Sequence, residues 1–496
     1  MLGLDSNMGF RPTQNILFFA ILFGIAFFFA TYHLTESPSV WYDEGIYIQL
    51  AANMAEGYGA SFQFAPGHIE EVPKFTVGYA FIYPLAATMY FFGDSVLVAR
   101  SFMVVCILGL FGTAFFSIRK RSGATTTLFA LALLVTFPPV YGNGKSVLGE
   151  VPALLLLALS LSNFQWALSS QKYSKLGLIL AGTFAGLAAA AKLLFLLFLP
   201  AFALIVLLEW YRGKLSRQDV ALAGLFSSLP VAIWMFVQYR SAPSFSEMLT
   251  FYANPYGVQN LFAVVKDNLI NFFTEAGPLY LLLLVLTWVI ALLIRKKRGI
   301  AIPAEESMAF VFSILVILSY LRITGWHRYL FPAQIMALLY FIPSLSYSIR
   351  WFSEKFAVKL PVISLWFQKL CVPVAVALLL LYGTYGVLFD SWVATAYQSD
   401  KTAFWEQYFN NIPSDTSFFF YDAPEVALFM PHRNYYQYLE LGGGPFGSEW
   451  LAVIDEGEVD RIIVRTDFLD EKKEFFLKRY SPKSTAYKYT VLEQLP

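Results

Sequence analysis

The stretch VGYAFIYPLAATMYFFG, residues 77–93, decides the topology of this 496-residue chain. It is apolar but short, and Pro84 interrupts it, so it fits either a membrane span or a helix in the membrane interface. A membrane is implied because 57% of the chain is hydrophobic and only 14% is charged, whereas about a quarter of the residues of a soluble domain are charged. The composition therefore excludes a water-soluble globule.

Eleven other apolar runs are long enough to cross a hydrocarbon core of roughly 30 Å as helices. They cover residues 15–33, 96–118, 124–141, 149–168, 176–191, 193–210, 220–239, 277–294, 306–323, 328–349 and 370–389. We predict a polytopic α-helical membrane protein with these eleven spans. No clear cleavage site follows the first run, so we expect it to act as a retained signal anchor.

Clusters of Lys and Arg indicate the orientation, because cytoplasmic loops collect these residues. If residues 77–93 do not cross the membrane, five basic clusters fall on one side, and if they do cross, all five fall outside. The clusters lie at 119–121, 172–175, 212–217, 295–298 and 350–359. We therefore expect a cytoplasmic N-terminus, with residues 34–95 and the C-terminal part of the chain outside.

The charged residues divide the chain into two predicted domains. About a quarter of residues 390–496 are charged, against about a tenth of residues 1–389. The first part is the predicted membrane domain, with interfacial helices in its 34–95 loop, and the second is a small soluble α/β domain. Its predicted strands are 418–421, 461–466 and 486–494, and its predicted helices are 401–412 and 470–478.

Several classes of partner and site are not expected. The net charge of +1 provides no basic footprint for nucleic acid. Cys106 and Cys371 lie inside apolar segments, so neither a disulfide framework nor a cysteine-based zinc site is indicated. His68 lies near Glu70 and Glu71, but the histidines lack the spacing of metal ligands, so we do not expect a histidine-based metal site.

The first loop carries the acidic residues of greatest interest, in WYDEGIYIQLAANMAEGYG, residues 41–59. The apolar residues recur at helical spacing, which predicts an amphipathic helix on the outer leaflet. They are Ile46, Tyr47, Leu50 and Met54. Asp43 and Glu44 stand in the first turn, where the helix dipole favours negative charge. The pattern alone fits a capped surface helix and a catalytic Asp43 equally well.

A span followed by W-Y-D-E-G-I-Y, an interfacial helix and V-P-K-F-T-V-G-Y resembles the GT-C glycosyltransferases. Within them it is similar to the branch of protein O-mannosyltransferases and lipid A aminoarabinose transferases. The resemblance implies a polytopic enzyme that uses a polyprenyl-phosphate sugar at the extracytoplasmic face, with an essential Asp in the first loop. Three further stretches extend it along the membrane domain: FFGDSVLVARSF (91–102), YGNGKSVLGEVPALLLLALSL (141–161) and WHRYLFPAQIMALLYF (326–341).

The resemblance assigns three carboxylates to the reaction. Asp43 matches the essential Asp, and we expect it to act as the general base or to orient the acceptor or a metal ion. Glu44 is expected to orient Asp43 or the acceptor. Glu150 matches the second acidic site, where many relatives carry Asp, and would hold a metal ion or the acceptor. The alternative for Glu150 is a helix terminus at the interface.

Cations are needed near the departing phosphate, because ammonium and guanidinium groups stabilise its charge. We expect Lys74 and Arg328 to do this, with Tyr329 beside Arg328 in the Arg-Tyr-Leu-x-Pro element. Relatives have Lys-Pro-Pro where this chain has Pro-Lys-Phe, and Lys74 also fits a lysine that reaches toward the headgroups. Arg328 equally fits an anchor in an aromatic belt. Weaker candidates are Lys145, Lys192 and His327.

The predicted activity is sugar transfer from a polyprenyl-phosphate donor to a hydroxyl of a lipid, glycan or protein acceptor, with inversion at the anomeric carbon. The cofactor is unknown; Mg²⁺ or Mn²⁺ on Asp43 and Glu150 would suit oxygen ligands. The alternative is a transporter or flippase for a lipid-linked glycan, although such proteins carry ionisable residues near the membrane midplane. The absence of Asn-x-Ser/Thr sequons suits a bacterial or archaeal plasma membrane.

Overall fold

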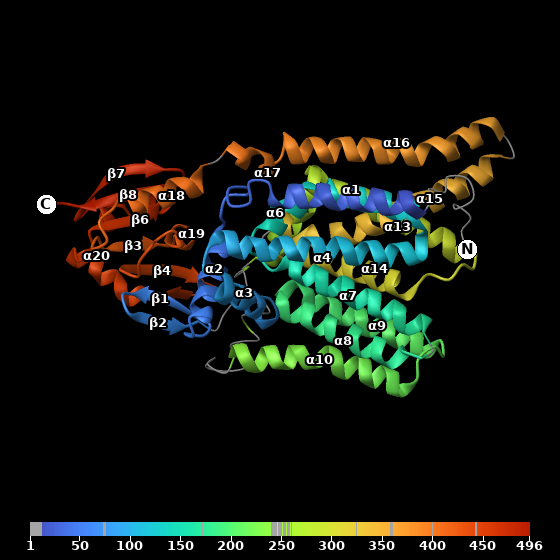
Figure 1. Cartoon of the computed structure of the whole chain (residues 1–496), viewed down its shortest axis with the longest axis horizontal. Helices are drawn as coiled ribbons and strands as arrows, with labels where there is room; N and C mark the ends of the chain where they lie inside the picture. Colours follow the sequence, from blue (N-terminus) through green and yellow to red (C-terminus); the bar gives the residue numbers. More distant parts are fainter. Residues whose placement is uncertain are drawn as a thin grey trace.

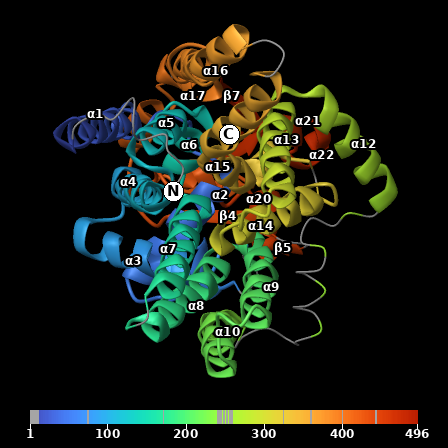
Figure 2. The same cartoon turned by 90° about the vertical axis from the view of Figure 1, so that its right-hand side faces the viewer.

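The computed structural model describes residues 12–496 except for 73–75, 171, 240–245, 247–249, 251–253, 255–257, 259, 324, 358–360, 399 and 442–443. The molecule is elongated, with long helices at one end and an α/β domain at the other (Figure 1). Seen along the bundle, α15 lies near the centre, with α1, α10, α12 and α16 at the periphery (Figure 2).

The bundle is built from helices that are mostly apolar. Their bounds are α1 (Pro12–Thr31), α4 (Val96–Ser122), α5 (Ala124–Val135), α6 (Pro138–Lys145), α7 (Glu150–Ser169), α8 (Ser174–Ala191), η1 (Leu193–Leu197), α9 (Phe198–Tyr211), α10 (Arg217–Tyr239), α12 (Leu261–Thr274), α13 (Ala276–Lys297), α14 (Ala304–Tyr320), η2 (His327–Leu330), α15 (Phe331–Ala357) and α16 (Pro361–Leu388). Among the described residues, eight helices are long and apolar enough to span a membrane, or nine if a bent pair counts as one. The prediction of an α-helical membrane protein is confirmed, but the count of eleven spans is not.

Two of the eleven predicted spans lie on helices outside this set of eight. The run at 15–33 lies on α1, a helix of 20 residues whose side chains are described from Asn15 onward. The run at 306–323 lies on α14, which has 17 residues and carries two glutamates in its first turn.

A third predicted span, 124–141, is not one helix. It divides into α5 and α6, which meet at an angle of 59°. Pro138 and Pro139 follow the break, and a proline has no backbone N–H and forces the residue before it away from the helical conformation. Phe137 accordingly has φ −88° and ψ 108°. The pair of prolines therefore ends α5 and begins α6.

The first loop forms a layer between the bundle and the α/β domain (Figure 1). It consists of α2 (Tyr42–Ala55), the antiparallel strands β1 (Ser61–Ala65) and β2 (His68–Glu71), and α3 (Tyr79–Phe92). The last of these covers the stretch 77–93 and has 14 residues, which is about 21 Å of helix. Such a helix is shorter than a hydrocarbon core of about 30 Å, as expected of an interfacial helix.

The α/β domain contains a six-stranded sheet in the order β5-β4-β3-β6-β8-β7. β3 pairs in parallel with β4 and β6, and β8 pairs with β6 and β7 antiparallel. The strands are β3 (Phe418–Tyr421), β4 (Tyr435–Leu441), β5 (Gly444–Phe446), β6 (Arg461–Arg465), β7 (Tyr480–Ala486) and β8 (Tyr489–Gln494). The three predicted strands correspond to β3, β6 and β8.

Short helices cover both faces of this sheet. α18 (Lys401–Asn410) and α19 (Pro424–Ala427) pack against one face, and α20 (Ala452–Glu456), α21 (Thr466–Glu471) and α22 (Lys473–Phe476) pack against the other. The predicted helix 401–412 corresponds to α18. The predicted helix 470–478 is replaced by the end of α21 and by α22.

Candidate active site

Glu44 fixes the first turn of α2 against two other parts of the chain. Its side chain is fully buried, and both carboxylate oxygens accept hydrogen bonds at 2.8 Å from the guanidinium of Arg100 on α4. The same carboxylate accepts from the backbone N–H of Trp41 and of Val147, each at 3.2 Å. These four hydrogen bonds hold the start of α2 against α4 and Val147.

Asp43, the neighbour of Glu44, faces Arg328. An Arg328 Nη2 hydrogen donates to Oδ2 of Asp43 at 2.6 Å, and the side chains are 9% and 26% exposed. Three aromatic rings surround the guanidinium, with centroids 5.8 Å away for Trp41, 4.8 Å for Trp326 and 5.3 Å for Tyr329. Arg328 also donates to the Tyr329 hydroxyl at 3.3 Å. Residues from the first loop and from a late span thus meet.

Glu150 and Lys192 form a second, more deeply buried pair. The Lys192 Nζ lies 3.5 Å from Oε1 of Glu150, and the side chains are 4% and 1% exposed. Glu150 is the first residue of α7, but its side chain does not cap that helix. Among the described residues, neither of its oxygens has a hydrogen-bond partner. A buried carboxylate without donors is costly, so Glu150 is a candidate for contact with a ligand.

Tyr47 lies between the two pairs. It stands one turn after Asp43 on α2, and its ring lies 5.2 Å from the Lys192 Nζ. Burial raises the pKa of the Tyr47 phenol well above its ordinary value, and the charges of Asp43 and Glu150 raise it further, while Arg328 acts in the opposite direction. Lys192 thus contacts the ring of Tyr47, and the charges of Asp43, Glu150 and Arg328 act on its phenol.

The end of the first loop pairs with the chain at the break between α8 and η1. Val77 forms an isolated antiparallel bridge with Lys192, and the Leu193 N–H donates to the Thr76 carbonyl at 3.0 Å. The Thr76 hydroxyl lies 2.9 Å from the hydroxyl of Tyr47. Lys192 has an extended backbone here, with φ −148° and ψ 130°. The pairing holds the Lys192 side chain toward Glu150.

The structure gives Lys145 and His327 partners outside these pairs. Lys145 is buried and donates to the Tyr32 carbonyl at 2.7 Å. His327 is half-exposed and forms an ion pair with Glu275. Lys74 lies outside the described residues, two positions before Thr76.

A cavity of about 570 Å³ adjoins this cluster on the side of Val77. Its lining is mainly apolar and comes from α2, α3, the β1–β2 region and the end of α10. Leu50 and Met54 line it, and these residues continue the face of α2 that carries Asp43 and Tyr47. None of the residues of the two ion pairs lines it; Val77, which pairs with Lys192, is the lining residue that links the cavity to them.

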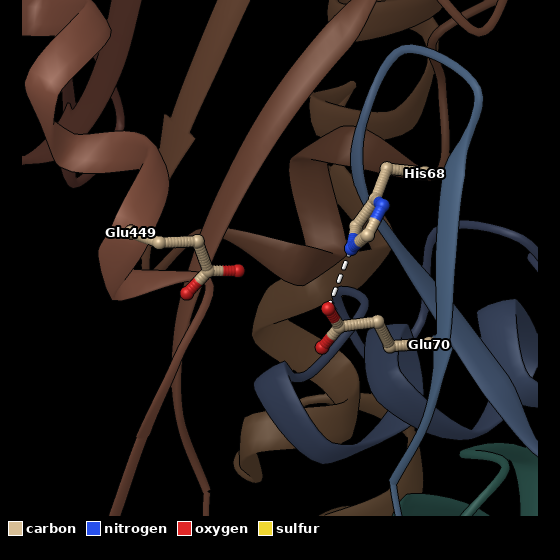
Figure 3. Close-up of side chains that lie close together, drawn as sticks. All are labelled: His68, Glu70 and Glu449. Carbon is tan, nitrogen blue, oxygen red and sulfur yellow. Dashed lines mark hydrogen bonds and ion pairs between the residues drawn. The ribbon is translucent and has the colours of Figure 1, made fainter.

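A group of possible metal ligands lies elsewhere, between β2 and η4 (Ser448–Leu451). One ligand atom each from His68, Glu70 and Glu449 lies within 4.8 Å of the others. Figure 3 shows His68 and Glu70 in contact, with the carboxylate of Glu449 facing them across a gap. All three side chains are partly or well exposed to solvent, and they are remote from Asp43 in the first turn of α2. The sequence gives no sign of Glu449, because it is distant along the chain.

Sequence reasoning did not assign a role to Tyr47, Thr76 or Arg100. Tyr47 belongs to the predicted apolar stripe, and its position four residues after Asp43 is the signal that places it on the same helix face. Thr76 lies in V-P-K-F-T-V-G-Y, and Arg100 ends the G-D-S-V-L-V-A-R stretch. Their partners are far away in the chain, so the pairs themselves give no local signal.

No family model and no curated protein sequence matches the chain. Among solved structures it is similar to ArnT from Cupriavidus metallidurans in the apo state, with TM-score 0.65, 12% identity and 97% of each chain covered. ArnT bound to undecaprenyl phosphate gives TM-score 0.61 and 13% identity, covering 97% of this chain and 98% of that one. The apo oligosaccharyltransferase of Archaeoglobus fulgidus gives 0.59 and 12%, covering 94% and 71%. Since these proteins are GT-C glycosyltransferases, the chain has the GT-C fold that the sequence resemblance predicts.

Proposed function

We propose that this protein is a glycosyltransferase that moves a sugar from a polyprenyl-phosphate donor to an acceptor hydroxyl at the extracytoplasmic face of the membrane. One observation carries the proposal. Two carboxylates, Asp43 and Glu150, each face a cation, Lys192 contacts the ring of Tyr47 between them, and the helix that carries Asp43 and Tyr47 also lines an apolar cavity. A lipid-linked donor requires both features, because its phosphate needs cations and its isoprenoid chain needs an apolar surface.

Asp43 is the proposed general base. Arg328 binds its Oδ2, and we assign proton abstraction from the acceptor hydroxyl to Oδ1. The acceptor oxygen then attacks the anomeric carbon directly, the bond to the phosphate oxygen breaks, and the configuration inverts.

Arg328 and Lys192 are the proposed partners of the departing phosphate. Guanidinium and ammonium groups stabilise the developing negative charge most strongly where water is excluded, and both side chains are at least nine-tenths buried. Lys74, two residues before Thr76, is a third proposed contact. Glu150 has no hydrogen-bond donor among the described residues, and we assign it to the acceptor or to a sugar hydroxyl. Glu44 acts by positioning α2.

The apolar cavity is the proposed place of the isoprenoid chain. It begins at Val77, beside the charged cluster, and its rim includes Tyr90, Phe91 and Phe236. These three rings are well exposed to their surroundings, as lipid-facing side chains are. ArnT has been solved with undecaprenyl phosphate bound, which supports a carrier lipid of this type.

A divalent cation does not fit the residues as they stand. Asp43 and Glu150 are the proposed ligands, but each already faces a cation of the protein. Mg²⁺ and Mn²⁺ would have to displace Arg328 and Lys192 from them. In the proposed reaction these two side chains therefore supply the positive charge.

The test is transfer of labelled sugar by the purified full-length protein in lipid nanodiscs. A panel of undecaprenyl-phosphate pentoses and hexoses is offered with a membrane extract as the source of acceptor. We expect the wild-type protein to transfer labelled sugar from one of these donors to an acceptor. Asp43→Asn should reduce this transfer by about a hundredfold or more, as loss of a general base does. Asp94→Asn, the same change on an exposed side chain, is the matched control.

Three results would reject the assignment. Near-normal transfer by Asp43→Asn excludes it as the base. A wild-type protein that moves no sugar from any donor in the panel argues against the activity. Movement of the intact lipid-linked sugar across the bilayer without transfer favours a flippase.

A further inference from the structure

The carboxyl edge of the C-terminal sheet contacts the helix that carries Asp43. β3 lies between the parallel strands β4 and β6. The helix that follows β3, α19, packs on the face of Phe418 and Phe420, whereas the helix that follows β6, α21, packs on the opposite face. Open α/β sheets bind their ligands at the strand ends where the connections diverge in this way. In this protein α2 occupies that position, at the carboxyl ends of the parallel strands.

Tyr42 provides the polar contact. Its hydroxyl donates to Oδ1 of Asp422, the residue after β3, at 2.5 Å, and lies 3.2 Å from the Glu440 carbonyl. The Glu440 N–H donates to the same Oδ1 at 3.1 Å. Asp422 is 5% exposed and has φ +49°, a left-handed conformation that Asp and Asn tolerate better than most residues. The carboxylate is thus aimed at Tyr42 by its own backbone.

Gly45 provides close contact between backbones. A Cβ on Gly45 would lie 2.5 Å from the backbone nitrogen of Glu425, so only glycine allows α2 to approach α19 this closely. One turn later, the Gln49 side chain donates to the Pro424 carbonyl at 2.9 Å. Tyr42, Gly45 and Gln49 follow the spacing of one helix face. The C-terminal domain therefore contacts α2 along a continuous stripe.

Asp43 and Tyr47 lie on a different face of α2 from this stripe. Successive residues of a helix are separated by 100°, so a helix held along Tyr42, Gly45 and Gln49 cannot rotate, and the direction of the Asp43 side chain is fixed. Burial, and after it the charge of Asp422, raise the pKa of the Tyr42 phenol, which therefore keeps the proton that it donates.

We propose that the C-terminal domain positions the catalytic helix, with Asp422 as a positioning residue that acts through Tyr42 on the direction of Asp43. This inference rests on the proposed function, because it gives Asp422 an effect on sugar transfer. Asp422 itself contacts neither the donor nor the acceptor. An error of about 1 Å in the placement of a reacting group can reduce a rate about a hundredfold.

The experiment combines Tyr42→Phe, Asp422→Gly and the double variant in the full-length protein. Glycine keeps the left-handed backbone of residue 422 and removes only the carboxylate. We expect each single change to lower kcat by about tenfold to a hundredfold with little change in the donor KM. The double variant should be no worse than the more harmful single change, because both remove one interaction. Asp422→Asn retains an acceptor and should keep most of the activity.

The control is Tyr487→Phe, which removes a comparable tyrosine-to-carboxylate bond, to Asp400 at 2.7 Å, away from α2. Hydrogen–deuterium exchange of the α2 amides is a second readout. We expect it to rise in Tyr42→Phe and Asp422→Gly but not in Tyr487→Phe.

Three outcomes would overturn the proposal: additive losses in the double variant, a Tyr42→Phe kcat equal to that of Tyr487→Phe, or unchanged α2 exchange. The exchange readout needs no substrate, so it still tests the contact if the wild-type protein transfers no sugar. Tyr42→Phe decides the question alone if Asp422→Gly does not fold.

Discussion

Two adjacent carboxylates in this protein have opposite environments. Glu44 is fully buried and forms a bidentate ion pair with Arg100, whereas Asp43 is 26% exposed and faces Arg328. The cause is the geometry of α2, since neighbouring side chains on a helix point 100° apart. Glu44 points into the protein and Asp43 toward Arg328, so we expect the two residues to contribute separately, Glu44 to stability and Asp43 to the proposed chemistry.

This separation gives a paired prediction. Glu44→Gln should destabilise the protein by about 3–5 kcal/mol, because it leaves the Arg100 charge buried without a partner. Asp43→Asn should destabilise the protein less than Glu44→Gln does while it abolishes transfer, because Asp43 is 26% exposed whereas Glu44 is fully buried, even though Arg328 also loses a charged partner. Denaturant unfolding of the two variants in the same detergent measures the difference. Equal destabilisation by both would contradict it.

At the residue scale, the sequence identified members of the site but not their partners. Asp43, Glu150 and Arg328 stand in stretches that resemble family motifs, and all three lie in the cluster. Lys145 and His327 had similar signals at the ends of spans, yet their side chains turn to Tyr32 and Glu275. A side chain's direction depends on packing between segments that are distant in sequence, and no local pattern contains that information.

At the element scale, periodicity and composition located most helices and three strands. β4 was missed because NYYQYLELGGG has a glycine run beside polar residues, which indicates a loop, whereas Tyr435–Leu441 joins the sheet through the buried β3. The break between α5 and α6 was missed for a different reason. The sequence stays apolar across Pro138 and Pro139, so hydropathy shows no break there. The helical backbone hydrogen bonds stop, because neither proline has an N–H to donate.

The bridge between the first loop and the α8–η1 break carries an element-scale prediction. A Cβ on Gly78 would lie 2.3 Å from the Ala190 carbonyl oxygen and 2.5 Å from the Trp234 Nε1. Gly78→Ala should push the loop from α8, displace Lys192 from Glu150 and lower transfer at least about tenfold. Gly112→Ala, at a helical glycine with open space around it, is the control. Transfer assays on both variants are the measurement, and equal rates would contradict this role for the bridge.

At the scale of the whole molecule, the fold was predictable because its causes are global. A hydrophobic fraction of 57% and long apolar runs require spanning helices. The higher content of charged residues after residue 390 predicts a domain outside the membrane. The number of spans was less predictable, because a run of apolar residues does not show where a helix bends or how long it stays regular.

Orientation in the membrane is a prediction that labelling can test. Lys478 lies on the exposed surface of the C-terminal domain, and Lys175 lies at the exposed start of α8. Each is replaced by cysteine in a separate variant, Lys478→Cys or Lys175→Cys. In cells carrying a variant without the two native cysteines, a membrane-impermeant maleimide should label the first at once and the second only after permeabilisation. Labelling in the reverse order would invert the topology and would place the proposed site in the cytoplasm.

The stripe between α2 and α19 has a consequence for biosynthesis. A ribosome makes Gly45 near the beginning of the chain and Glu425 only after the bundle helices have been made. Until then the first loop rests on the bundle alone and α2 lacks its contact with α19, so under the proposed positioning role we expect a truncated chain to leave Asp43 misdirected. If the proposed role of Asp43 holds, activity arrives only with the last segment synthesised, and we expect unfinished copies in the bilayer to be inactive.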